Sequence, residues 1–164
     1  GANTFAPLPG GGLVARLAGL LVPRVADLVT VRLADGPEGG SRLAQVAHAD
    51  PRKAALAEEL YGRYTAPPER PGPARVMLTG EPELVTDAGE EMRRAYALDA
   101  AFTDGLRRLA VTSYVSLPLR ARGAVFGALT LMTTEESGRR YDEGDLAPAL
   151  EVARRAALAI ENAR

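Results

Sequence analysis

The stretch SYVSLPLRARGAVFGALTLMTT, from Ser113 to Thr134, constrains the fold more than any other part of the sequence. Its two arms are rich in apolar and β-branched residues, which predicts two β-strands joined at Ala121-Arg122-Gly123. Strands joined by so short a loop pair antiparallel. Pro118 has no N–H to donate, so we expect its strand to lie at or near the edge of a sheet.

The two faces of this predicted ribbon differ in character. A three-residue loop would pair Arg120 with Ala124, and period-two alternation then sorts the side chains. The first face carries Val115, Leu117, Leu119, Val125, Gly127, Leu129 and Leu131. The second face carries Tyr114, Ser116, Pro118, Ala124, Phe126, Ala128, Thr130 and Met132. We expect helices on the first face, with Gly127 allowing a helix to come close.

The second face has small residues in mid-strand and a few polar groups. That composition suits the floor of a cavity in which a few polar atoms orient a ligand. An ordinary packed core, in which Ala128 makes room for a side chain above it, explains the same pattern equally well.

The rest of the chain alternates between helical and strand patterns. Helices are expected over residues 13–25, 51–64, 74–79 and 145–164, and further strands over 27–33, 42–48 and 83–86. Residues 87–109 are expected to be helical or irregular. This order predicts the α+β class, with a central antiparallel sheet of about five to six strands. Residues 1–12 are rich in glycine and proline and are expected to be a flexible lead-in to a single domain over 13–164.

Both end helices carry apolar residues on two sides, which predicts that each is covered by the sheet and by a partner chain. A homodimer through the first and last helices is therefore expected. Asp145 is expected to cap the last helix rather than Asp142, because Pro148 then falls in the first turn, where its missing N–H costs little. Asp50, followed by Pro51, is expected to cap the second helix.

The composition excludes several classes of chemistry. The chain has no cysteine, which rules out disulfides, thiolate catalysis and cysteine-based zinc sites. His48 is the only histidine, so no triad, metal site, catalytic residue or cofactor is predicted. A net charge of −1 gives no reason to expect nucleic acid or an anionic membrane as a partner. No segment approaches the roughly 20 apolar residues that cross a bilayer, and a cytoplasmic location is expected.

The last third of the sequence resembles the C-terminal half of a GAF domain. The residues that carry the resemblance are Pro118-Leu119, Gly127-Ala128-Leu129, Tyr141-Asp142, Asp145-Leu146 and the helix end AIENA, Ala159 to Ala163. The resemblance implies that the first and last helices pack on one face of the sheet and that middle helices roof a small-molecule pocket on the other. The chain is most similar to GAF modules of actinobacterial signalling proteins, which often precede a PPM-type phosphatase or a histidine kinase. An effector domain of this kind is expected outside the chain.

We therefore predict a non-catalytic sensory domain that binds an unidentified small molecule and relays its occupancy through the terminal helices. The residues expected at the pocket are Tyr114, Ser116, Ala128, Thr130, Met132, His48, Tyr96 and Phe102. Ordinary packing is the alternative for Tyr96 and Phe102, and a strand-end residue satisfied by backbone is the alternative for His48. The cysteines of the sulfoxide-reducing and bilin-binding branches are absent, as is the Asn-Lys-x-Phe-Asp-Glu signature of the cyclic-nucleotide branch. A dimerisation and linker module with a closed pocket is the second hypothesis.

Overall fold

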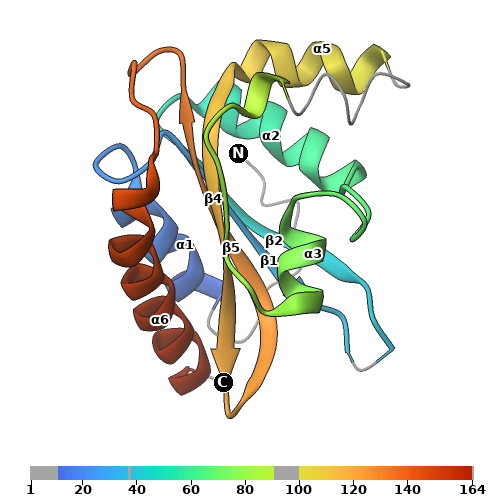
Figure 1. Cartoon of the computed structure of the whole chain (residues 1–164), viewed down its shortest axis with the longest axis vertical. Helices are drawn as coiled ribbons and strands as arrows, with labels where there is room; N and C mark the ends of the chain where they lie inside the picture. The colour runs from blue at the N-terminus through green and yellow to red at the C-terminus, as the bar shows by residue number, and fades with distance from the viewer. Residues whose placement is uncertain (1–10, 37, 91–99, 164) are drawn as a thin grey trace.

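The computed structural model describes residues 11–36, 38–90 and 100–163 of the 164-residue chain. These residues form a five-stranded antiparallel sheet in the order β2-β1-β5-β4-β3 (Figure 1). The strands are β1 Leu28–Ala34, β2 Ser41–His48, β3 Glu83–Val85, β4 Val111–Ala121 and β5 Ala124–Thr134. The helices are α1 Gly11–Leu21, α2 Pro51–Arg63, α3 Pro73–Thr79, α5 Ala100–Leu109 and α6 Leu146–Asn162, with a 3₁₀ turn, η1, at Glu143–Asp145. The predicted α+β class and antiparallel sheet are confirmed.

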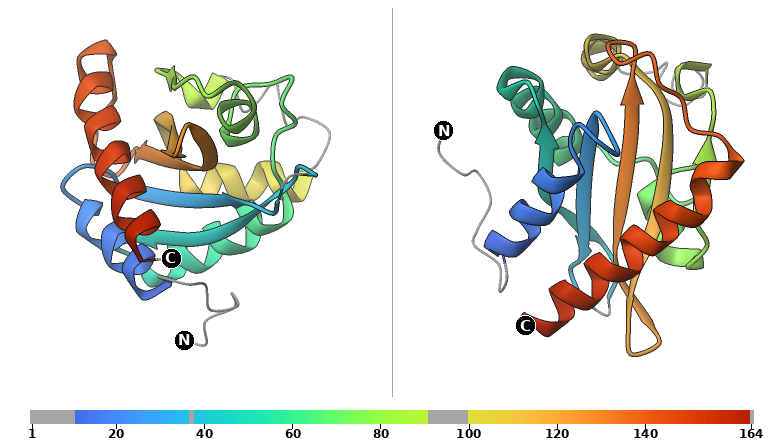
Figure 2. Two further views of the ribbon diagram at one scale, coloured as in Figure 1. Left: turned by 90° about the horizontal axis from the view of Figure 1, so that it is seen from below. Right: turned by 90° about the vertical axis from the view of Figure 1, so that its left-hand side faces the viewer.

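One face of the sheet, which we call the helix face, is covered by α1 and α6. The two helices lie side by side there, as Figure 2 shows. The core on this face includes Val14, Ala18, Val29, Val31, Val115, Leu117, Leu119, Leu129, Leu131, Ala153, Ala157 and Ile160. Alanines on α6 let that helix approach the sheet closely, because a methyl group adds little to the separation. The predicted packing of the two terminal helices on one face is confirmed.

The opposite face, which we call the roof face, is covered by α2, α3 and α5 (Figure 2). Its core includes Leu28, Leu43, Val46, Ala57, Leu60, Phe102, Leu106, Leu109, Tyr114 and Met132. None of the described helices is both long enough and apolar enough to span a membrane.

The turn between β4 and β5 differs from the predicted three-residue loop. Ala121 rather than Arg120 pairs with Ala124, so Arg122-Gly123 form a two-residue loop. Both loop residues have left-handed backbone angles, φ 54° at Arg122 and φ 78° at Gly123. This conformation matches the right-handed twist of the flanking strands, which is why tight hairpins favour it.

A bulge beside this turn moves two residues to faces opposite to those predicted. Arg120 pairs with Val125 and Leu119 with Gly127, which leaves Phe126 as the extra residue in β5. Phe126 packs against the helix-face core, whereas Val125 lines a groove on the roof face. The predicted faces of Phe126 and Val125 are therefore wrong. From Gly127 onward the bulge restores the predicted alternation, because the pairing has shifted by an even number of residues.

The neighbouring strand β1, rather than a helix, explains why position 127 is a glycine. A Cβ atom at Gly127 would lie only 2.4 Å from the backbone oxygen of Arg32 in β1. Gly127 pairs with Leu33 of β1 and directly follows the bulge at Phe126. The prediction that Gly127 admits a helix is wrong.

The substitution Gly127→Ala tests this close approach. We expect it to lower the free energy of unfolding by about 1–3 kcal/mol, because the new methyl group must displace backbone. Gly19→Ala on α1 is the matched control, since a Cβ there meets nothing within 4 Å. That variant should be as stable as the parent or up to about 1 kcal/mol more stable. Urea denaturation measures both, and equal stabilities of the two variants would contradict the proposed clash.

Pro118 lies near an edge of the sheet, as predicted. The short edge strand β3 pairs only with Tyr114, Val115 and Ser116 of β4. Pro118 is beyond the end of β3 and pairs on its other side with Ala128. Its missing N–H therefore interrupts no pairing with the edge strand.

Of the two predicted helix caps, one is confirmed and one is corrected. Asp50 Oδ1 accepts a hydrogen bond from the Arg52 N–H at 2.9 Å, as expected of the α2 cap. The helix α6 does begin directly after Asp145, but the Asp145 side chain makes no cap bond to it. Instead Asp142 accepts from the Gly144 N–H and Asp145 accepts from the Asp142 N–H, each at 2.8 Å. The acidic cluster thus stabilises η1, the turn that leads into α6.

The half-buried carboxylate of Asp27 joins the segment before β1 to the end of β5 and the loop that follows it. Asp27 Oδ2 accepts from the Thr134 N–H at 2.8 Å and from the Ser137 hydroxyl at 2.5 Å. Asp27 Oδ1 accepts from Arg139 at 2.7 Å, and Arg139 also donates to two carbonyls of the α1–β1 connection, at 2.7 and 2.8 Å. Burial alone would raise the pKa of Asp27, but these bonds together lower it below its ordinary value of 3.8. Asp27 is therefore a carboxylate at neutral pH.

Candidate functional site

The five predicted site residues of the ribbon lie together on the roof face. Tyr114 pairs with Met132 and Ser116 with Thr130, and Ala128 follows on the same face of β5. All five side chains are buried. The alternation of side chains along each strand was sufficient to place these five residues on one face, because the bulge lies between them and the turn.

A row of hydroxyl groups crosses the middle of this face. Ser116 Oγ and Thr130 Oγ1 are 3.0 Å apart and share a hydrogen bond. Thr30 of β1 pairs with Thr130 from the other side, and its side chain is also buried. Hydroxyls can rotate to accept or donate, so this row can exchange its internal bonds for bonds to a ligand. Thr30 was not among the predicted site residues, although its alternation with Leu28 in β1 indicates the same face.

The two aromatic residues predicted for the roof have different outcomes. Phe102 of α5 is fully buried, and its ring centroid lies 4.3 Å from that of Tyr64. It belongs to the roof-face core with Met132, so packing accounts for its position. Tyr96 lies outside the described residues.

His48 closes the turn between β2 and α2. Its Nδ1 atom accepts a hydrogen bond from the Asp50 N–H at 2.9 Å. Its Nε2 atom is buried and has no partner among the described residues. Burial lowers the pKa of His48 below its ordinary value of 6.5, and the positive charge of Lys53 lowers it further. The structure therefore supports the alternative interpretation of His48, a strand-end residue bonded to backbone.

The lowered pKa of His48 predicts a pH-dependent stability. The unfolded chain takes up a proton near pH 6.5, whereas folded His48 resists protonation until a lower pH. The free energy of unfolding should therefore fall as the pH drops from about 7 to about 5. His48→Asn keeps an acceptor for Asp50 but does not titrate, so it should flatten this dependence. Urea denaturation across the range measures both slopes, and identical slopes would refute the assignment.

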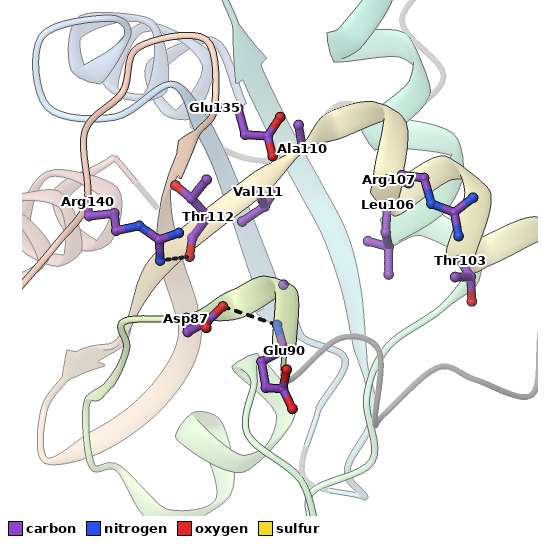
Figure 3. A pocket seen from close by; sticks show the side chains of 11 residues that line it. Asp87, Glu90, Thr103, Leu106, Arg107, Ala110, Val111, Thr112, Glu135 and Arg140 are labelled. Carbon is purple, nitrogen blue, oxygen red and sulfur yellow. Dashed lines mark hydrogen bonds between the residues drawn. The ribbon is translucent and has the colours of Figure 1, made fainter.

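A first groove lies where α5 ends and β4 begins (Figure 3), with a volume of about 410 Å³. Its lining carries charges of both signs, from the acidic residues Asp87, Glu90 and Glu135 and the basic residues Arg107 and Arg140. Asp87 Oδ1 accepts from the Glu90 N–H at 3.2 Å, and Arg140 donates to two backbone carbonyls at 2.7 and 3.2 Å. Asp87 and Arg140 therefore stabilise the chain around the groove.

A second groove, which we call the Arg32 groove, has a volume of about 500 Å³ and lies on the roof face. It is bounded by the β1–β2 hairpin, the α2–α3 loop and α3. Arg32 pairs across the sheet with Ala128, one of the predicted floor residues. The groove therefore extends the predicted ligand face toward the hairpin.

Arg32 is buried in this groove, with 6% of its surface exposed. It donates to Ser41 Oγ at 3.1 Å and to the Tyr61 carbonyl at 2.8 Å, which joins β1 to β2 and α2. Burial lowers the pKa of the Arg32 guanidinium, and nearby Asp35 offsets part of that effect. Arg32 was not among the predicted site residues. Alternation along β1 places Arg32 on the same side of the strand as Leu28, so the sequence already indicated a charged residue on a buried face.

The described residues contain no group of three or more histidine or acidic side chains that could hold a metal ion. The groups that the described residues could present to a ligand are hydroxyls, one buried guanidinium and apolar walls.

Comparison with known proteins identifies the family. The GAF domain family model matches residues 14–161, and the chain belongs to that family. The comparison with curated proteins finds no match.

Solved structures of bacterial GAF domains share the fold. A GAF domain region of a putative membrane protein from Geobacter sulfurreducens PCA is 17% identical, with a TM-score of 0.65 and 92% of each chain covered. A domain of a putative two-component sensor histidine kinase from Sinorhizobium meliloti 1021 is 14% identical, with a TM-score of 0.58, over 91% of this chain and 88% of that one. A GAF domain/HD domain protein from Geobacter sulfurreducens is 15% identical, with a TM-score of 0.65, over 96% and 98%. A lone GAF domain is usually a non-catalytic regulatory module of signalling proteins.

Proposed function

We propose that this chain is a non-catalytic sensory domain that binds a small molecule on its roof face and relays occupancy through α1 and α6. The relay would reach an effector domain outside the chain. Structural relatives support this reading, since one is part of a two-component sensor histidine kinase and another is a GAF domain/HD domain protein. The cytoplasmic location, the actinobacterial origin and the identity of the effector stay predictions.

The observation that carries the proposal is that β4 and β5 are buried on both faces. Thr130 and Met132 point into the roof side, while the alternating residues Leu129 and Leu131 contact the helix-face core. A packed core transmits displacement because it has few voids to absorb it. A ligand that shifts the roof-facing side chains would therefore also shift the surface on which α1 and α6 rest.

A small-molecule library tests the sensory role. We expect at least one metabolite to raise the midpoint of thermal unfolding, because binding to the folded state alone stabilises it. The same compound should change hydrogen exchange in α1 and α6 as well as on the roof face. Protection limited to the roof face would argue against the relay.

The second candidate function, a dimerisation and linker module, has an observation in its favour. All five predicted floor residues of the ribbon are buried, as expected of a closed pocket. Dimerisation itself belongs to both hypotheses. Exposed leucines on the terminal helices support it: Leu20 on α1 and Leu150 and Leu158 on α6, with 72%, 39% and 50% of their surfaces exposed.

The oligomeric state provides a direct test. We expect the chain to be a dimer by light scattering, and Leu158→Glu to shift it toward the monomer by placing a charge in the interface. Leu78→Glu on α3 is the matched control, because Leu78 is also exposed but lies on the roof side. It should leave the oligomeric state unchanged. A monomeric parent at high concentration would reject the dimer.

A further inference from the structure

Arg32 is a buried cation with no carboxylate bonded to it among the described residues. Its three hydrogen bonds go to neutral acceptors, namely Ser41 Oγ, the Ser41 carbonyl and the Tyr61 carbonyl, at 3.1, 3.4 and 2.8 Å. Asp35, the acidic residue that influences it, is half exposed and pairs with Arg42 at 2.9 Å. A buried charge without a counter-charge is costly, so an anion bound here would be strongly favoured.

The guanidinium also retains hydrogen-bonding capacity. It has more N–H donors than its three hydrogen bonds use, and its planar fork matches the two oxygens of a carboxylate. Ser41 and Thr65 add polar groups to the groove lining. These groups define the place where an anionic head would lie.

The remainder of the groove is apolar. Its walls include Ala66 and Pro67 of the α2–α3 loop, Ala74 and Met77 of α3, and Val125 of β5. A volume of about 500 Å³ is typical of a small-ligand site. Such walls favour an uncharged hydrocarbon or aromatic body attached to the anionic head.

We propose that the Arg32 groove binds a small organic carboxylate, with its carboxylate on Arg32 and its apolar body against α3 and the α2–α3 loop. This inference rests on the proposed sensory function and names the chemical class of its ligand. Arg32 is the one cation among the described lining residues, which favours a monoanion over a phosphate ester. The described lining also has no acidic residue to pair with an ammonium group, so an amino acid should bind more weakly than its deaminated acid.

Three compounds with one carbon skeleton test this chemistry on the parent chain: 4-methylpentanoate, 4-methylpentanamide and leucine. Benzoate and benzamide repeat the acid and amide comparison with a flat body. Titrations followed by amide NMR shifts report both affinity and location. We expect at least one acid to shift the amides of Ser41, Thr65 and Met77. Its amide, and leucine in the aliphatic series, should bind at least about tenfold more weakly, equivalent to about 1.4 kcal/mol.

Three variants separate binding from folding. Arg32→Met should abolish binding of the acid, whereas Arg63→Met, the loss of an exposed charge at the end of α2, should leave it unchanged. Ala74→Phe fills the groove without altering Arg32 and should also block the acid. If Arg32→Met fails to fold, Ala74→Phe and the acid and amide comparison decide the question.

Two results would overturn the proposal: neither acid binds in the groove, or acid and amide bind equally. A purely structural Arg32 predicts the first of these results, together with an unstable Arg32→Met variant. Neither result would reject the sensory role, because a neutral metabolite from the library screen could still bind elsewhere on the roof face. A library without any binder, by contrast, would reject the sensory role itself.

Discussion

The structure depends on burying the β4–β5 hairpin on both faces. Every inward residue of these strands must fit one of two cores, the helix-face core under α1 and α6 or the roof-face core under α2, α3 and α5. Because successive side chains alternate, a one-residue slip would exchange the two cores completely. The bulge at Phe126 lies next to the turn, where the residues of β5 are exposed or only partly buried. Gly127, the next residue after the bulge, has no room for a side chain beside β1.

The terminal helices are held to this hairpin by polar contacts as well as by packing. Asp27 and Arg139 join the segment before β1 to the segment after β5. Tyr141 donates from its hydroxyl to the Val25 carbonyl at 2.6 Å, which adds a second connection between the same segments. The entry into the sheet from α1 and the exit toward α6 are therefore one connected unit. In the proposed sensory role, this connection would couple the two terminal helices that carry the output.

How much of the site could be predicted from sequence follows from the range of each interaction. Tyr114, Ser116, Ala128, Thr130 and Met132 were grouped correctly on one face because alternation along a strand is a local property. Phe126 and Val125 were assigned to the wrong faces because a bulge depends on the turn geometry of both strands together. His48 was placed correctly at a strand end, but its bond to Asp50 shows a local role that its residue type alone does not reveal. Whether the five grouped residues contact a ligand stays a prediction.

The sequence by itself determined the α+β class, the order of elements, the two faces of the hairpin away from its turn and the family resemblance. These features follow from periodicity, turn residues and motifs within single segments. Only the tertiary structure decided that Gly127 accommodates β1 and that Arg32 is buried beside an apolar groove. The surroundings of Arg32 come from β2, α2, α3 and β5, which are far apart in the chain. The burial of a charge depends on such neighbours, and a single segment of sequence carries no information about them.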